Sequence, residues 1–219
     1  FGESEDCLYA NIWVPKGAHA SLPVVIFIHG GGFMKRSGSF PGYWGDRMVT
    51  ESDAPVVFIT FNYRLGIFGF FNWEDSAANF GFQDQQLLLQ WVQANIRAFG
   101  GDPNQVLLTG QSAGAMSVVC HLAAPGSRGL FRRAIANSPV GVHYRSRKEN
   151  EAFVRTVAKT VGCDWVWTRN ITACLLSKSA ASLKRADIVP EYLVHFKKPC
   201  SECDNYLPWV PVIDPSTLP

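Results

Sequence analysis

The stretch Leu107-Leu108-Thr109-Gly110-Gln111-Ser112-Ala113-Gly114-Ala115 reads as a buried strand that ends in Gly-x-Ser-x-Gly and turns directly into a helix. This context puts a serine on a sharp strand-to-helix turn, with its hydroxyl exposed at the end of a sheet. Glycines flank the serine because so tight a turn leaves no room for Cβ atoms. Chance alone supplies the pattern in roughly 5–10% of chains of this length, so the surrounding sequence must decide its meaning.

Composition limits the classes of protein to which the chain belongs. Its 219 residues suffice for one large domain or one and a half ordinary ones, and 47% hydrophobic with 17% charged residues is typical of a globular protein. The net charge of +2 favours neither a nucleic-acid surface nor an acidic tail. Apolar runs such as Val24–Ile28 are too short to span a bilayer. The opening residues 1–6 lack a signal-peptide pattern and read like the middle of a domain.

Short apolar runs alternate with helical patterns along the chain. Strands are predicted over residues 7–14, 23–28, 56–64, 106–109 and 133–138. Helices are predicted around 47–51, on the face formed by Leu87, Leu88, Trp91, Val92 and Ile96, over 113–124, and after a capping box at 146–149. Residues 65–80 are expected to form a loop. This order favours an α/β fold with a mostly parallel sheet covered by helices on both faces.

A serine hydroxyl is a weak nucleophile until a base removes its proton, and its attack on a carbonyl needs donors for the oxyanion that forms. The amide of Ala113 follows Ser112 directly and is one candidate donor. The Gly30-Gly31-Gly32 run follows the strand at 23–28 and lets backbone N–H groups point into a site unobstructed. Alone, that run is most simply a flexible turn. Paired in this order with Ser112, it matches the combination found in lipases and esterases.

Six ordered motifs then carry a family resemblance. They are Ser4-Glu5-Asp6-Cys7-Leu8-Tyr9, His29-Gly30-Gly31-Gly32-Phe33, Phe61-Asn62-Tyr63-Arg64-Leu65-Gly66, Asn79-Phe80-Gly81 through Asp84-Gln85-Gln86, Trp91-Val92-Gln93-Ala94-Asn95-Ile96, and Ala98-Phe99-Gly100-Gly101-Asp102-Pro103. Together with Gly110–Gly114, they resemble the carboxylesterase/cholinesterase (type-B carboxylesterase) family of the α/β-hydrolase fold. The tail Val210–Asp214 also resembles esterases and bile-salt-activated lipases. Residues 1–219 then read as a single partial domain, incomplete at both ends.

The resemblance implies hydrolysis of small-molecule or lipid carboxylic esters through an acyl-enzyme, without metal or cofactor. Ser112 would attack, and Gly31, Gly32 and Ala113 would supply the oxyanion N–H groups. Gln111 stands where the family often has Glu, which changes the local field without abolishing activity. The rival hypothesis is a catalytically inactive adhesion or binding domain, as in neuroligins, but such relatives typically lack the serine.

The catalytic acid and histidine are expected to lie outside this chain. The order in this fold is serine, acid, histidine, and in the family both partners lie further downstream than this chain extends. The histidines within this chain are predicted to have roles other than that of the catalytic base. His121 is expected to be packed, His29 to fix the glycine loop by hydrogen bonding, and His143 to lie in a solvated loop or line an acyl pocket, whereas His195 is a poor candidate base. The chain alone is therefore expected to be inactive or nearly so.

The cysteines favour a secretory compartment. Cys163 and Cys174 bracket a short polar loop, and the resemblance implies that they form a disulfide. The same loop holds the glycosylation sequon at Asn170. The resemblance also gives Cys7 a partner upstream of this chain. Cys120 is interpreted as a buried thiol. The Cys-x-x-Cys pair Cys200 and Cys203 is interpreted as a metal half-site or a redox pair, and no second pair or His-x-His partner lies nearby in the sequence to complete a metal site.

The remaining polar residues are predicted to have structural or surface roles. Arg64 and Asp84 are interpreted as an internal polar pair or as separate backbone anchors. A solvated surface is predicted for Arg145, Arg147, Lys148, Lys197 and Lys198. The tryptophans Trp165 and Trp167, in the cysteine-flanked loop, either contact substrate or a partner or pack on the surface. The sequence leaves the oligomeric state open.

Overall fold

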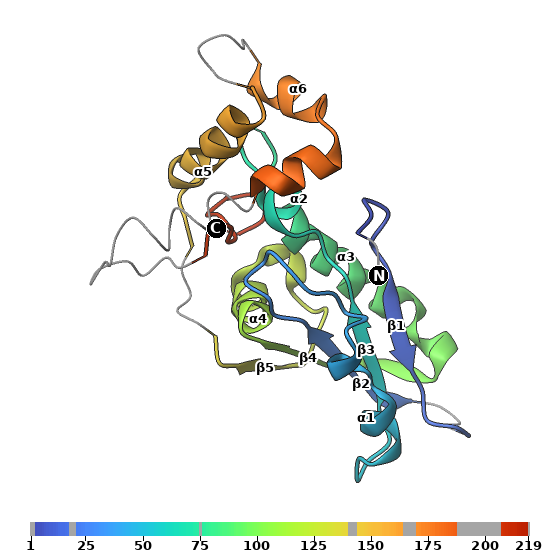
Figure 1. Ribbon diagram of the computed structural model, residues 1–219. Helices are drawn as coiled ribbons and strands as arrows, with labels where there is room; N and C mark the ends of the chain where they lie inside the picture. The colour runs from blue at the N-terminus through green and yellow to red at the C-terminus, as the bar shows by residue number, and fades with distance from the viewer. Residues whose placement is uncertain are drawn as a thin grey trace.

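The computed structural model describes residues 3–17, 21–74, 76–139, 144–163, 170–187 and 207–218. Its centre is a five-stranded sheet in the order β1-β3-β2-β4-β5 (Figure 1). The strands are β1 (Ala10–Trp13), β2 (Leu22–Ile28), β3 (Val57–Phe61), β4 (Gly101–Gln111) and β5 (Arg133–Asn137). β1 runs antiparallel to β3, and the remaining pairs are parallel. The predicted α/β fold with a mostly parallel sheet is confirmed.

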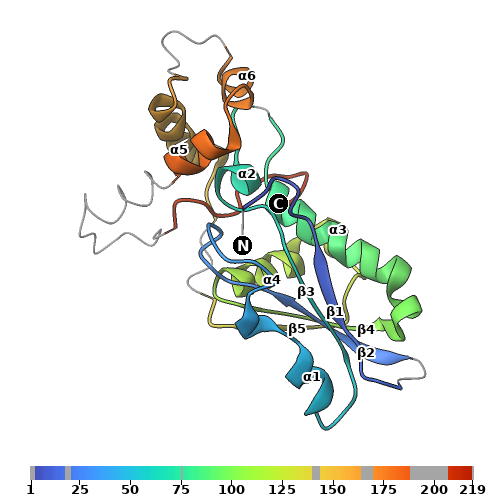
Figure 2. The same ribbon diagram turned by 45° about the vertical axis from the view of Figure 1, so that its right-hand side comes forward.

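The helices occupy both sides of this sheet. They are α1 (Asp46–Thr50), α2 (Gly66–Phe70), α3 (Phe80–Asn95), α4 (Ala113–Ala123), α5 (Arg147–Thr160) and α6 (Ile171–Leu176), with short 3-10 turns at Pro41–Tyr43, Ile96–Phe99 and Pro125–Ser127. Parallel crossovers are right-handed, so the change of direction after β3 puts α1 on one face and α3 with α4 on the other (Figure 2). None of the helices within the described ranges combines the length and the apolar composition that a membrane span needs.

The main core lies between the sheet and helices α3 and α4. Register places Val24, Val57 and Val106 side by side on this face, and all three are buried. Because side chains alternate between the faces of a strand, Ile26 and Leu108 follow on the same face. α4 is itself almost wholly buried, as its apolar sequence predicts. Burial on this scale fixes the register, since a slip of one residue would expose the whole row.

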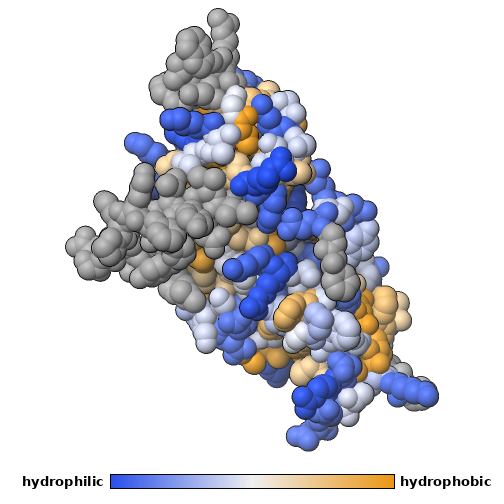
Figure 3. Space-filling view, viewed as in Figure 1, coloured by the Kyte–Doolittle hydropathy of each residue, from blue (hydrophilic) through white to orange (hydrophobic). Residues whose placement is uncertain are grey.

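The structure corrects three sequence predictions of elements. The 65–80 stretch is not all loop, because α2 forms within it. β4 begins at Gly101 and is longer than the predicted 106–109 strand. The face predicted for α3 is partly wrong: Val92 and Ile96 are buried as predicted, but Leu87 and Trp91 are exposed, and Leu89, which was not part of that face, is buried. On the surface of Figure 3, the hydrophobic area at the lower right lies over β1 and the end of α3.

The helix predicted after the capping box is α5. Ser146 accepts from the Glu149 N–H, and the Glu149 carboxylate accepts from the Ser146 N–H. The prediction that Arg145 and Arg147 are solvated is wrong, whereas Lys148 is exposed. Both arginines are drawn inward because they bind residues 207–218, here called the tail segment: Arg145 contacts its first two carbonyls and Arg147 pairs with Asp214.

Candidate active site

Two neighbouring strands deliver the predicted site residues to the same edge of the sheet. β2 pairs with β4, and Ile28 lies opposite Gly110 in the register. The chain leaves β2 toward β3 on one side, whereas β4 continues to β5 on the other. The carboxyl ends of β2 and β4 therefore flank a topological switch point, where open α/β sheets bind their ligands. The glycine loop follows the first strand, and Ser112 follows the second.

Ser112 occupies a backbone conformation that few residues other than glycine adopt. Its φ is 56° and its ψ is −122°, and it is the residue immediately before α4. The Ser112 N–H donates to the Asn137 carbonyl at 3.0 Å, and its own carbonyl accepts from the Met116 N–H. These bonds tie the turn to β5 on one side and to α4 on the other. Strain of this kind clusters at functional sites, where the surrounding structure maintains it.

The two glycines that flank Ser112 are required by close packing of the backbone. A Cβ at Gly114 would lie 2.0 Å from the Ile28 carbonyl oxygen, and one at Gly110 would lie 2.4 Å from the Gly114 oxygen. Both distances are far below any contact that a real Cβ makes. The spacing of the motif therefore follows from the approach of α4 to the ends of β2 and β4.

The glycine loop lies directly against the serine turn. A Cβ at Gly30 would come within 3.1 Å of the Ser112 Cβ. The Gly31 carbonyl accepts from the N–H groups of Met34 and Lys35, which turns the loop back on itself. Within the described residues, the N–H groups of Gly31, Gly32 and Ala113 donate to no protein acceptor. The structure thus brings the predicted glycine loop into contact, through Gly30, with the turn that carries Ser112.

His29 supports the glycine loop through a hydrogen bond. Its Nδ1 lies 2.8 Å from the Gly30 oxygen, so Nδ1 carries the proton and donates. Its ring stacks on Tyr63 with centroids 4.5 Å apart, and the Tyr63 hydroxyl donates to the His29 carbonyl. Burial lowers the pKa of His29 to about 4, so the ring is neutral near pH 7. The sequence analysis predicted the role of His29 but missed that of Tyr63. Tyr63 lies in one of the motifs that carry the family resemblance, but no role was assigned to it.

His121 is packed, as predicted, and does not face Ser112. Its Nδ1 lies 2.8 Å from the Ser127 hydroxyl, and its Nε2 lies 3.0 Å from the Gln85 Oε1. Its ring stacks on Phe82, and burial lowers its pKa to about 3. Both ring nitrogens are occupied in this polar cluster, so His121 is not free to act as a base. The predictions for His143, His195, Trp165, Trp167, Lys197, Lys198, Cys200 and Cys203 fall outside the described residues.

The other predicted polar and cysteine residues have structural roles. Arg64 donates from Nε and Nη2 to the two oxygens of Asp84 at 2.8 and 2.7 Å, which confirms the internal pair. Cys163 and Cys174 form a disulfide, and Cys120 is a buried thiol whose pKa is raised by burial to about 12. In the described ranges, no group of three or more His, Cys, Asp or Glu side chains is arranged to hold a metal ion.

Comparison with known proteins gives a consistent result. A profile described as the carboxylesterase family matches residues 1–219. The chain is 38% identical to a bile salt-activated lipase from Mus musculus, with 98% of this chain and 37% of that protein covered. It is 42% identical to a juvenile hormone esterase from Tribolium castaneum, with 85% and 34% covered. The solved structure of a PNB esterase superposes with a TM-score of 0.83 at 35% identity and covers 99% of this chain and 44% of that one.

Proposed function

The chain belongs to the carboxylesterase family of the α/β-hydrolase fold, and from this premise we propose that Ser112 is the nucleophile of an ester hydrolase that works through an acyl-enzyme. The observation that carries the proposal is the contact between Gly30 and the Ser112 turn, which puts a loop with unused N–H groups beside a strained serine. The substrate class is a small-molecule or lipid carboxylic ester, and the chemistry needs no cofactor.

The proposed steps follow from this geometry. Ser112 Oγ attacks the ester carbonyl while a base takes its proton, and the carbonyl oxygen becomes an oxyanion. The N–H groups of Gly31, Gly32 and Ala113 donate to that oxygen. Ala113 is the first residue of α4, so its N–H also lies at the positive end of the helix dipole. As the tetrahedral intermediate collapses, the base gives the proton taken from Ser112 to the leaving oxygen, which departs as the alcohol and leaves the acyl group on Ser112. The base then takes a proton from water, which attacks the acyl group, and the acid and Ser112 are released.

The base and its acidic partner are proposed to come from outside residues 1–219. Of the described histidines, His121 has both nitrogens bound, and His29 is buried with its Nδ1–H donated to the Gly30 carbonyl. The chain spans 37% of the mouse lipase that it matches, and the whole protein's activity is therefore a proposal. On this reading, the chain alone lacks the acid and the histidine and is a poor catalyst.

An inactive binding domain is the weaker alternative. A protein that needs no nucleophile gains nothing from holding a serine at φ 56° beside a glycine loop. Gln111 is exposed and neutral, and it lies against the glycine loop, because a Cβ at Gly30 would come within 3.0 Å of the Gln111 Oε1.

A fluorophosphonate probe tests the proposal. We expect the full-length protein to be labelled at Ser112 and the Ser112→Ala variant to be unlabelled. Isolated residues 1–219 should react far more slowly, because no base activates the serine. An adjacent control is Ser117→Ala, which removes another hydroxyl of α4 that instead accepts from the Gln85 side chain. A folded full-length protein without Ser112 labelling would refute the esterase proposal.

A secretory location is proposed on two features. One is the Cys163–Cys174 disulfide. The other is the sequon at Asn170, which is exposed at the start of α6. Its Oδ1 accepts from the Ala173 N–H at 2.8 Å, which leaves the cap intact when a glycan is attached to Nδ2. A mass shift that is reversed by an amidase specific for N-glycans, and is absent in Asn170→Gln, is the expected result.

A further inference from the structure

Arg145 is a buried cation that is held by backbone carbonyls. Its residue exposure is only 3%, and no carboxylate within the described residues forms an ion pair with it. Nη2 donates to the Leu207 carbonyl at 2.6 Å, and Nη1 donates to the carbonyl of Pro208. The guanidinium carbon lies 4.0 Å from the centroid of the Phe153 ring. A planar fork that satisfies two successive carbonyls is a geometry that arginine offers and lysine does not.

The end of the tail segment that Arg145 holds reaches the glycine loop. A Cβ at Gly32 would lie 3.0 Å from the Leu207 Cδ2, so the Leu207 side chain packs directly on the Gly32 backbone. Gly32 has φ +64°, and its N–H is one of the proposed oxyanion donors. Two contacts thus connect the guanidinium to the loop: Arg145 to the 207–208 carbonyls, and Leu207 to Gly32.

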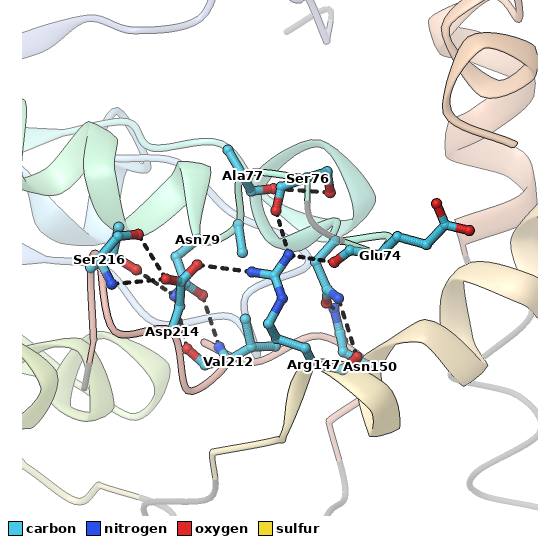
Figure 4. Close-up of polar contacts among 12 residues, drawn as sticks. Glu74, Ser76, Ala77, Asn79, Arg147, Asn150, Val212, Asp214 and Ser216 are labelled. Atoms are coloured by element: carbon cyan, nitrogen blue, oxygen red, sulfur yellow. Dashed lines mark hydrogen bonds and ion pairs between the residues drawn. The ribbon is translucent and has the colours of Figure 1, made fainter. Parts of the chain in front are cut away.

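The rest of the tail segment has anchors of its own. The Asn79 side chain donates to the Val212 carbonyl and accepts from the Val212 N–H, both at 2.8 Å. Arg147 pairs with Asp214 at 2.9 Å and donates to the Glu74 and Ser76 carbonyls (Figure 4). These bonds, together with the one that the Ile213 N–H donates to the Arg145 backbone carbonyl, hold residues 212–218 without the Arg145 side chain. The side chain of Arg145 serves the other end, where the segment touches the loop.

We infer that Arg145 is a positioning residue for the oxyanion loop, which it acts on by pressing Leu207 against Gly32. The inference rests on the proposed function, because the loop matters for rate only if Ser112 attacks an ester. Arg145 touches no reacting atom. Its role is to fix where the Gly32 N–H points, and the effect of losing it should therefore appear in the rate of the chemical step.

The test compares kcat and KM for p-nitrophenyl acetate in the full-length protein. Removal of a whole oxyanion donor lowers kcat about 100- to 1000-fold. Since Arg145→Met should only loosen one donor, we expect kcat to fall about tenfold with KM within twofold. Arg147→Met is the matched control: it removes the cation on α5 that pairs with Asp214 near the other end of the tail segment, and its kcat should stay within twofold even if stability falls.

A second variant keeps the test decisive if Arg145→Met does not fold. Leu207→Ala leaves the arginine in place, removes the contact with Gly32, and should lower kcat to a similar degree. The inference is overturned if folded Arg145→Met keeps the wild-type kcat, if Leu207→Ala does so, or if Arg147→Met loses as much as Arg145→Met. Failure of the proposed function looks different, because the wild-type protein itself would then neither hydrolyse the ester nor be labelled at Ser112.

Discussion

Gly114 shows how a single missing side chain permits the serine turn. A Cβ there would lie 2.0 Å from the Ile28 carbonyl oxygen, a backbone atom that cannot move without distorting β2. We expect Gly114→Ala to lower the free energy of unfolding by about 3 kcal/mol or more, as measured by urea denaturation.

Gly129→Ala is the control for this variant. Gly129 has φ +78°, but a Cβ at this position would meet no other atom within 4 Å. The substitution therefore introduces only left-handed backbone strain, with a cost of about 1–2 kcal/mol. An equal loss in the two variants would contradict the assignment of the Gly114 effect to a clash with β2.

The buried histidines predict how stability depends on pH. His29 and His121 have their pKa lowered by burial from 6.5 to about 4 and about 3. Between pH 6.5 and these values the unfolded chain binds more protons than the folded one, so stability rises with pH and falls on acidification. Each histidine should contribute a slope of up to about 1.4 kcal/mol per pH unit in that window.

His121→Gln tests this assignment directly. The variant should be less stable near pH 7, because the bonds with Ser127 and Gln85 are disturbed. Its stability should nevertheless fall less steeply than that of the wild type between pH 6 and pH 4. Urea denaturation at a series of pH values measures both quantities. Identical slopes for the two proteins would show that His121 is not the titrating group.

Residue-level prediction from the sequence succeeded where local backbone geometry determines the side chain. The positions of Ser112 and of its flanking glycines follow from a tight turn, and the five adjacent residues Gly110–Gly114 suffice to predict that turn. Arg145 shows the opposite case. Charge alone predicts exposure, but the arginine is buried because carbonyls more than 60 residues away accept its hydrogen bonds. No local pattern contains that information.

At the scale of elements, α3 and α2 show the limits of periodicity. α3 has apolar residues on several sides, so the helical spacing that correctly included the buried Val92 also admitted the exposed Leu87 and Trp91 and left out the buried Leu89. The choice between the faces depends on what packs against the helix. α2 spans only Gly66–Phe70, and its start is held from a distance, because Gly66 donates to the Phe33 carbonyl.

Asn79 is predicted to be the strongest single anchor of the tail segment. It is fully buried and makes three hydrogen bonds, two with the Val212 backbone and one with the Thr217 hydroxyl. Asn79→Ala leaves the buried N–H and carbonyl of Val212 without partners, so we expect a loss of about 2–4 kcal/mol in unfolding free energy. Faster proteolysis within residues 207–218 should accompany it.

Asn95→Ala is the control for that experiment. Asn79 is the N-cap residue of α3, whereas Asn95 is the last residue of that helix; Asn95 also donates through Nδ2, but its acceptor is the nearby Trp91 carbonyl and the bond is exposed. Its loss should cost less than about 0.5 kcal/mol. If the two variants were equally stable and equally resistant to protease, the tail segment would not depend on Asn79.

At the scale of the whole molecule, the order of the strands in the sheet brings the glycine loop and Ser112 together. The sequence predicts strands and helices in the correct order, but the order of strands in the sheet depends on which edges pair. Only the arrangement β3-β2-β4 makes β2 and β4 neighbours with diverging connections. The glycine loop and Ser112 are about 80 residues apart in the sequence, and that neighbour relation is what brings them into contact. The motif resemblance anticipated this outcome, whereas periodicity did not.

The outer edge of β5 predicts how the chain behaves when it is separated from the rest of a longer protein. β5 pairs with β4, and among the described residues no strand covers its other edge. Ile135 on this strand is 48% exposed, and Leu122 on the adjoining α4 is 63% exposed. An uncovered strand edge with apolar side chains is a site of self-association. Isolated residues 1–219 should therefore associate in a concentration-dependent way, which sedimentation velocity would detect.

Ile135→Lys should have different effects in isolated residues 1–219 and in the full-length protein. In the isolated chain, the lysine should reduce association because a charge on an edge strand opposes further pairing. In the full-length protein, where we expect other residues to cover β5, burying the ammonium should instead cost stability, by about 2 kcal/mol or more. Arg133→Lys on the same strand keeps the charge and should change neither measurement. An Ile135→Lys full-length protein as stable as the wild type would mean that the Ile135 side chain faces solvent in the complete molecule as well.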